Sequence, residues 1–174
     1  MRNGHTVQTG NSRYLKIFRS KKFVLCGAAA VLTVCIFAII DSHRIHPAPE
    51  ADNPRCTRIT SLAPEQVSGK TRDWTIGKGV AAWGSGAAVL RCGVDELPPN
   101  INLCVSVDGI DWVLDEKTLE EKGVSILRTY GRSPAVELTY SGPREEVGGI
   151  LASLNAAIDW IPQDEECIGS SDIS

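Results

Sequence analysis

The sequence predicts an α+β fold, in which a small antiparallel sheet carries a C-terminal helix packed on one face and is preceded by a single transmembrane helix. Three observations predict it. Residues 23–40 contain no charged side chain. Residues 103–107 alternate between apolar and polar side chains, which is typical of a half-buried strand. Residues 147–161 carry apolar side chains at helical spacing, which predicts an amphipathic helix.

The uncharged segment Phe23–Ile40 is 18 residues long. As a helix it would extend about 27 Å, which is enough to cross the hydrocarbon core of a bilayer. Five Lys or Arg side chains lie between residues 13 and 22, directly before it. Because positively charged flanks stay in the cytoplasm, we expect a single-pass protein of the cell membrane with a cytoplasmic basic tail, residues 1–22. A cleaved signal peptide is the alternative, although no Ala-x-Ala site follows the segment.

The distribution of charge agrees with this topology. Residues 1–44 carry seven Lys or Arg and one acid, whereas the remainder carries 11 Lys or Arg and 20 acids. We therefore expect residues 41–54, which are polar and contain prolines, to be a tether. Residues 55–174 would form an extracytoplasmic domain. So acidic a domain is a poor candidate for binding nucleic acid or anionic lipid.

Four cysteines lie outside the predicted anchor, and an even number in an oxidising compartment predicts two disulfides. Three pairings are open. We favour Cys92–Cys104, which would join two neighbouring strands, and Cys56–Cys167, which would join the two ends of the domain. A four-cysteine metal site is disfavoured because the sequence lacks close Cys-x-x-Cys pairs.

The elements of the domain follow from local patterns. The segment SLAPEQV, residues 61–67, predicts a short helix that Ser61 would cap. Strands are expected at 72–76, 87–92, 103–107 and 110–114, with a turn at Asp108-Gly109 and a loop or single helical turn at 117–122.

The C-terminal part gives the clearest predictions. Residues 124–130 and 135–140 have strand composition and flank Gly131-Arg132-Ser133-Pro134, which predicts a hairpin with a four-residue loop. A helix should begin at Pro143 and end before Pro162, with Gly148 and Gly149 packed closely on the sheet.

Histidine is absent from residues 55–174, since His5, His43 and His46 all precede them. This excludes Ser-His-Asp and Cys-His catalysis and histidine-ligated zinc in the domain, and we expect no metal and no cofactor. A pair of carboxylates remains conceivable for hydrolysis, with Asp108 and Asp111 as the candidates.

Five residues are candidates for binding a ligand. Arg91 and Arg132 lie at strand ends, where a guanidinium could clamp a carboxylate or phosphate. Trp83, Trp112 and Tyr130 could offer ring faces to a sugar or peptide. Each has a structural alternative, which is an internal ion pair or carbonyl contact for the arginines and core packing for the aromatic residues.

Three stretches, AWGSGAAVLRCG (82–93), VDGIDW (107–112) and TYGRSPAVELTY (129–140), resemble an uncharacterised actinobacterial envelope family, domain of unknown function 3515. Together with Cys56 and Cys167 the resemblance covers roughly residues 55–167. It implies a membrane anchor or lipoprotein signal followed by a small cysteine-bearing domain, and it implies no catalytic residue. The family's loop after Trp-Gly is commonly proline-rich, whereas here it reads Ser85-Gly86-Ala87.

These observations favour a non-enzymatic binding or scaffold domain that engages an envelope protein or a cell-wall component. Two alternatives are an envelope enzyme that uses carboxylates and a structural subunit of a membrane complex.

Overall fold

The computed structural model describes residues 32–35 and 44–167. The chain divides into two units, Met1–Ser42 and His43–Ser174. In the first unit residues 32–35 are helical. Among the described residues, no helix has the length and apolar character needed to span a bilayer. The predicted anchor Phe23–Ile40 lies outside them, apart from those four residues, and stays a prediction.

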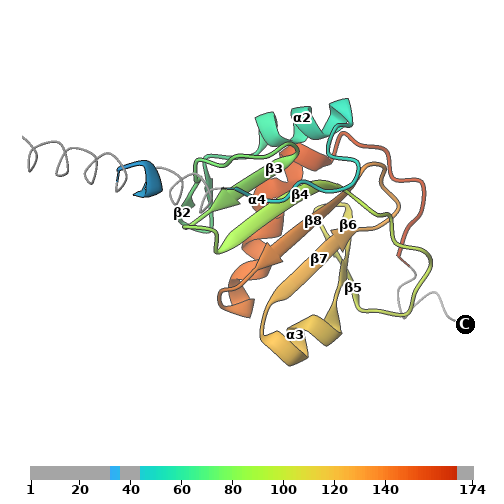
Figure 1. The fold of residues 1–174 in the computed structure, drawn as a ribbon. Coiled ribbons are helices and arrows are strands. Elements are labelled where there is room, and N and C mark those ends of the chain that lie inside the picture. Colours follow the sequence, from blue (N-terminus) through green and yellow to red (C-terminus); the bar gives the residue numbers. More distant parts are fainter. Residues whose placement is uncertain (1–31, 36–43, 168–174) are drawn as a thin grey trace, which may run out of the picture. The chain divides into compact units, whose positions relative to one another are not determined.

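The second unit is built on a six-stranded antiparallel sheet with the strand order β3-β4-β8-β7-β6-β5 (Figure 1). This confirms the predicted α+β class with an antiparallel sheet. A separate two-stranded ribbon, β1-β2, precedes the large sheet in the chain. The strands are β1 (Gln66–Val67), β2 (Lys70–Thr71), β3 (Val80–Trp83), β4 (Ala88–Val94), β5 (Cys104–Val107), β6 (Ile110–Leu114), β7 (Ser125–Thr129) and β8 (Ala135–Tyr140).

Two hairpins agree with the turn chemistry of the sequence. Asp108 and Gly109 join β5 to β6 with φ values of 49° and 80°, which is the conformation of a two-residue hairpin turn that glycine and aspartate favour. The predicted hairpin around Gly131–Pro134 joins β7 to β8. In contrast, residues 72–76 do not form the expected strand, because the chain there runs from β2 to β3 and makes only isolated bridges at Arg72 and Ile76.

The C-terminal helix lies on one face of the sheet, as predicted (Figure 1). After a 3₁₀ turn, η1 (Arg144–Glu146), α4 (Val147–Ile158) buries one apolar side. Gly148 and Gly149 do not pack on the sheet, since both are exposed. Another helix, α3 (Glu116–Lys122), precedes β7 in the chain; its N-cap is Asp115 and its C-cap is Gly123.

The first helix of the domain lies earlier than predicted. It is α2 (Pro54–Leu62), whose N-cap Asn53 accepts a hydrogen bond from the backbone of Arg55. Proline suits the first helical position because its missing N–H has no partner there in any case. Ser61 is therefore at the end of a helix and is not a cap. The stronger start signal was the pair Asn53-Pro54.

Most of the expected tether, from Ile45 onward, is part of the folded unit. The Ile45 N–H donates to Ile76 O at 3.1 Å and the Glu50 N–H to Gly93 O at 2.9 Å. Ala48 and Ala51 are buried against the end of the sheet. Gly93 has a φ of 85°, and a Cβ there would lie 2.4 Å from the carbonyl carbon of Glu50. The folded unit thus begins before Arg55.

All four cysteines of the domain form disulfides, but the favoured pairing is wrong. The bonds are Cys56–Cys92, between α2 and β4, and Cys104–Cys167, between β5 and residues 159–167. We call residues 159–167, which follow α4, the C-terminal segment. The strand order explains the error, because β8, β7 and β6 lie between β4 and β5. At about 4.8 Å per strand, Cys92 and Cys104 are much too far apart for a disulfide.

The sheet has two different faces. One packs against α2 and α4, and Leu90, Leu138 and Leu127 lie side by side on it across β4, β8 and β7. The opposite face, which we call the open face, carries Arg91, Glu137 and Arg128 in register on the same strands. Because successive side chains point to opposite faces of a sheet, the period-two segments of the sequence separate the core from this polar surface.

Candidate functional site

Two of the predicted ligand residues belong to the core. Trp83 and Trp112 have 0% exposure, so neither offers a ring face to a ligand. The Trp83 indole N–H donates to Pro64 O at 2.8 Å. The structural alternative therefore describes both tryptophans, and the five candidates do not form one surface.

Arg91 lies on the open face beside a buried carboxylate. Its Nε is 3.9 Å from Glu137 Oε1, while Arg128 Nη2 donates to Glu137 Oε2 at 2.7 Å. Glu137 is only 7% exposed, so two arginines neutralise it from the neighbouring strands. This internal ion pair is the structural alternative foreseen for Arg91.

Arg132 joins three parts of the chain at the end of the sheet. Its guanidinium donates to the carbonyl oxygens of Ile161, Asp159 (3.3 Å) and Gly109 (3.0 Å). Burial lowers the pKa of Arg132, and the nearby carboxylates of Asp111 and Asp159 oppose that shift. Its donors are thus directed at the end of α4 and the β5–β6 turn.

The two carboxylates proposed for hydrolysis, Asp108 and Asp111, lie in different environments. Asp108 is exposed in the hairpin turn. Asp111 is 8% exposed, and its Oδ2 accepts hydrogen bonds from Gln163 Nε2 and from the Cys167 N–H, both at 2.9 Å. Asp111 therefore anchors the C-terminal segment through these two hydrogen bonds to Oδ2.

Two adjoining pockets lie at the end of the sheet where Tyr130 and Arg132 follow β7. The larger, of about 300 Å³, is bounded by Tyr130, Val113, the β4–β5 loop and the C-terminal segment. The second, of about 260 Å³, contains Arg132 and shares Pro99 and Glu165 with the first. We call the two together the end pocket; its polar lining residues are Glu96, Asn100, Asn102, Thr129, Tyr130, Arg132, Ser133, Asp164, Glu165 and Glu166.

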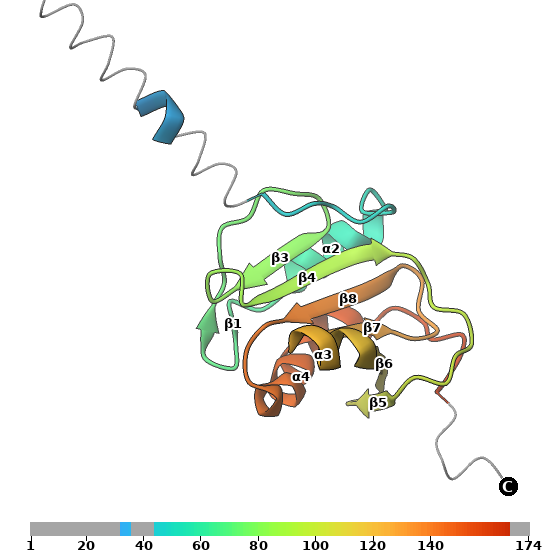
Figure 2. The same ribbon diagram turned by 60° about the horizontal axis from the view of Figure 1, so that its bottom comes forward.

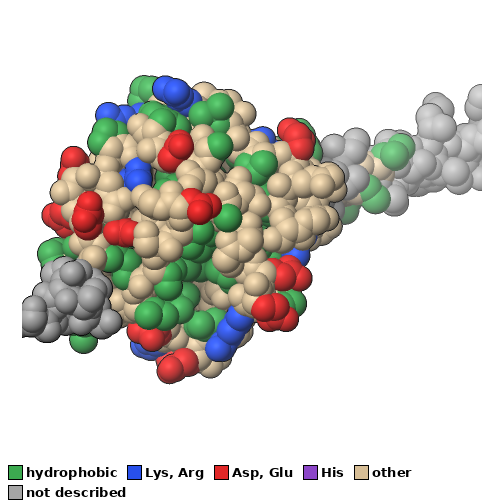
Figure 3. Space-filling model, turned by 180° about the vertical axis from the view of Figure 1, so that it is seen from behind, with side chains coloured by type: hydrophobic (Ala, Val, Ile, Leu, Met, Phe, Trp, Pro, Cys, Tyr) green, Lys and Arg blue, Asp and Glu red, His purple; other side chains and the backbone are tan. Residues whose placement is uncertain are grey.

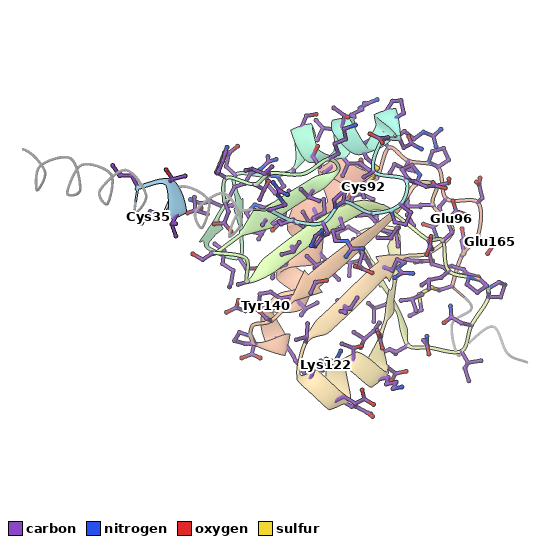
Figure 4. All side chains as sticks on the ribbon, in the orientation of Figure 1. Cys35, Cys92, Glu96, Lys122, Tyr140 and Glu165 are labelled. Atoms are coloured by element: carbon purple, nitrogen blue, oxygen red, sulfur yellow. A yellow bond between two sulfur atoms is a disulfide. The ribbon has the colours of Figure 1, made fainter. Side chains whose placement is uncertain are left out.

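The walls of the end pocket come from two segments that are distant in sequence. Figure 4 shows Glu96, from the β4–β5 loop, close to Glu165 of the C-terminal segment. Figure 3 shows acidic side chains gathered on the side of the molecule where the described chain ends. Four acids, Glu96, Asp164, Glu165 and Glu166, line the end pocket beside one arginine, Arg132, so the charge of the lining is predominantly negative.

The C-terminal wall is held at three points. The disulfide to Cys104 fixes Cys167, and Asp111 binds the same residue through its backbone. The Asp164 N–H donates to Gly131 O at 2.7 Å. Gly131 is required here, since its φ is 65° and a Cβ would lie 1.9 Å from Glu165 O. The wall is therefore a preorganised part of the fold.

Tyr130 lines the larger pocket and is 9% exposed. A hydrogen bond to the Glu165 carboxylate raises the pKa of the Tyr130 phenol, and burial adds to the shift. Tyr130 is the one predicted ligand residue that lines the larger pocket.

The family model described as "Protein of unknown function (DUF3515)" matches residues 25–166. The chain belongs to the DUF3515 family. The match includes most of the predicted anchor, both sheets and every residue of the end pocket except Cys167. No curated protein and no solved structure matched the chain.

The DUF3515 pocket combines four carboxylates with neutral hydrogen-bonding groups and one guanidinium. That guanidinium belongs to Arg132, whose Nη1 and Nη2 atoms donate to backbone carbonyl oxygens of the fold. Carboxylates accept hydrogen bonds from ammonium and guanidinium groups, while asparagine amides and a phenol both donate and accept. No group of three or more His, Cys, Asp or Glu suited to a metal ion occurs in the described part of the chain. The arrangement thus suits an organic cation or a polar chain with basic groups.

Sequence reasoning missed most of this DUF3515 site. The sequence analysis singled out none of Glu165, Glu166, Asn100 and Asn102, because no motif or periodicity marks them. One signal could have found them. The two asparagines lie shortly before Cys104 and the two glutamates directly before Cys167, and the disulfide between these cysteines brings the two segments together.

Proposed function

We propose that this chain is a membrane-anchored, non-enzymatic binding module of the cell envelope, and that the end pocket binds a cationic group of an envelope protein or cell-wall component. The observation that carries the proposal is the end pocket itself, in which carboxylates from two distant segments face a common cavity. The disulfide and Asp111 hold these segments in place, so the ligand does not need to order them on binding.

The described chemistry supports binding more than catalysis. Within residues 44–167 the only histidine is His46, which lies in the segment before α2. The best candidate for a catalytic carboxylate, Asp111, is engaged in two hydrogen bonds with the C-terminal segment. A general acid or base must reach a proton of the substrate, and Asp111 is only 8% exposed.

Placement in the envelope is supported by two features of the chain. The uncharged stretch Phe23–Ile40 follows a basic segment, as a signal anchor does. The domain also holds two disulfides, which persist in oxidising compartments outside the cytoplasm. On this basis the domain faces the envelope and the basic tail faces the cytoplasm.

The proposal is tested with the full-length chain in detergent micelles and with spermine, a small polyamine, as the probe. We expect calorimetry to show saturable binding that weakens as salt is added, because salt screens exposed charges. Replacing Glu165 and Glu166 together by glutamine should weaken binding about tenfold, since exposed ion pairs contribute up to about 1 kcal/mol each.

The matched control is the double variant Glu120→Gln and Glu121→Gln, which removes the same charge from exposed positions on α3. It should bind spermine as the wild type does. Equal weakening in both double variants would show that spermine senses only the net charge and would overturn the assignment of the end pocket.

A further inference from the structure

We propose that the free edge of β5 binds an extended peptide segment of a partner protein, which adds a seventh strand to the sheet. Basic and apolar residues alternate along this peptide segment. The inference rests on the proposed function, because the basic side chains of this segment would enter the end pocket. It goes beyond that function by naming the class of partner and the backbone groups that bind it.

The two edge strands of the large sheet differ in whether their outward backbone groups are hydrogen-bonded. At the β3 edge, residues 71–73 run alongside the strand, and Asp73 N–H donates to Ala82 O at 2.8 Å while Gly84 N–H donates to Thr71 O at 3.0 Å. At the other edge β5 is the last strand of the sheet, and Figure 2 shows no labelled element beyond it. Only the β3 edge has its backbone groups covered in the described chain.

The register defines which β5 groups are available. Leu114 N–H donates to Leu103 O at 2.9 Å, and Cys104 pairs with Val113. Because hydrogen-bonded and non-hydrogen-bonded pairs alternate along an antiparallel ladder, Val105 and Val107 bond to β6. The N–H and C=O groups of Cys104 and Ser106 therefore point outward, away from the sheet.

The edge is short, but it lacks three of the devices that prevent strand addition. Edge strands are commonly blocked by proline, by lysine or by a bulge. The segment Cys104–Val107 reads CVSV, and it pairs with β6 without a shift of register. Ser106 at its centre is exposed. The backbone of β5 is thus a template for another strand.

The side chains around β5 specify an alternating partner. On the helix side, Leu103, Val105 and Val107 follow one another, with Leu103 49% exposed and Ile101 fully exposed just before it. On the open-face side, Cys104 and Asn102 line the larger pocket, whose outer wall carries Glu165 and Glu166. An added strand alternates between these two sides, so apolar residues suit the first and basic residues the second.

The charge of the region decides between a foreign peptide and a second copy of the chain. The end pocket beside β5 is lined by four carboxylates, of Glu96, Asp164, Glu165 and Glu166, and by one guanidinium, of Arg132. Pairing β5 with β5 of another copy would bring two such regions together, and like charges across an interface oppose association. A cationic strand gains from the same field.

The test uses the full-length chain in detergent micelles and a capped peptide of about nine residues with alternating Lys and Val. We expect binding to protect the amide protons of Cys104 and Ser106 from exchange with solvent. Ser106→Pro removes an outward N–H without touching the bonds to β6, and it should weaken peptide binding at least tenfold. Ser106→Ala keeps the N–H and should bind as the wild type does.

Spermine binding tests the proposed function separately from this inference, because a polyamine cannot form a strand. Ser106→Pro should retain wild-type spermine binding while losing the peptide. A peptide N-methylated at its Lys positions, whose amides face Cys104 and Ser106 when the added strand is antiparallel, should also bind the wild type at least tenfold more weakly, which covers a failure of the proline variant to fold.

Three results would overturn the inference. They are equal peptide affinity in Ser106→Pro and Ser106→Ala, unchanged protection of the Cys104 and Ser106 amides on peptide binding, and concentration-dependent protection of those amides without peptide. The last would show that a second copy of the chain occupies the edge.

Discussion

The backbone N–H of Cys167 donates a hydrogen bond to Asp111 Oδ2 at 2.9 Å, across 56 residues of sequence. The Gln163 side chain donates to the same oxygen. One buried carboxylate on β6 thus orients the segment that forms the outer wall of the end pocket. This relationship links the stability of the C-terminal segment to the shape of the site.

Replacing Asp111 by alanine should release that segment. The change leaves the Cys167 N–H without its acceptor, and a lost hydrogen bond to a charged group costs about 1.5–3 kcal/mol. We expect a lower midpoint of chemical unfolding, faster amide exchange at Cys167 and weaker spermine binding. Glu121→Ala, at an exposed position of α3, serves as control. Unchanged exchange at Cys167 would contradict the anchoring role.

The two disulfides should differ in their sensitivity to reductants. Cys56 and Cys92 are fully buried, whereas Cys104 and Cys167 are half-buried beside the end pocket. A thiolate must reach a sulfur atom to exchange with it, so mild reductant should open Cys104–Cys167 first. Mass mapping of alkylated protein checks the order, and early labelling of Cys56 or Cys92 would contradict it.

Removing each disulfide should cost stability by a similar amount. The bonds close loops with sequence separations of 36 and 63, for which the chain-entropy model gives about 4 kcal/mol in both cases. The double alanine variants of each pair, compared by chemical unfolding, measure the two contributions. Only the Cys104–Cys167 variant should also weaken spermine binding.

Acid should weaken the contact between β2 and the start of α4. Hydrogen bonds from Lys70 and then from Tyr140 lower the pKa of Glu146 below its ordinary value of 4.5. A carboxyl whose pKa is depressed by folding stabilises the fold above the unfolded pKa, and this contribution is lost as pH falls through the folded pKa. The difference in unfolding free energy between the wild type and Glu146→Gln should therefore shrink below about pH 4.5. A constant difference down to that range and below would contradict the role of the ion pair.

Gly148 offers a stabilising substitution on the exposed side of α4. A Cβ at this position meets no atom within 4 Å, whereas at Gly149 it would lie 3.0 Å from Ser68 Oγ. Glycine inside a helix costs about 0.5–1 kcal/mol relative to alanine. Gly148→Ala should raise the unfolding free energy by about that amount, and Gly149→Ala should gain less. A destabilised Gly148→Ala variant would show that this face of α4 has another role.

Local patterns in the sequence determined the elements that depend on neighbouring residues. The alternation in β5, the Asp108-Gly109 turn, the β7–β8 hairpin and the apolar side of α4 could all be predicted, because hydrophobic periodicity and turn chemistry act over a few residues. The presence of two disulfides followed in the same way from four cysteines outside the predicted anchor.

The tertiary structure alone decided what the chain brings together over long distances. The strand order places β4 and β5 on opposite sides of the sheet, and so determines which cysteines can meet. It also buries Trp83 and Trp112 and joins Glu96 to Glu165 at one pocket. Spacing along the chain does not encode such contacts, since they depend on how every element packs on the others, and the end pocket exists only where those elements meet.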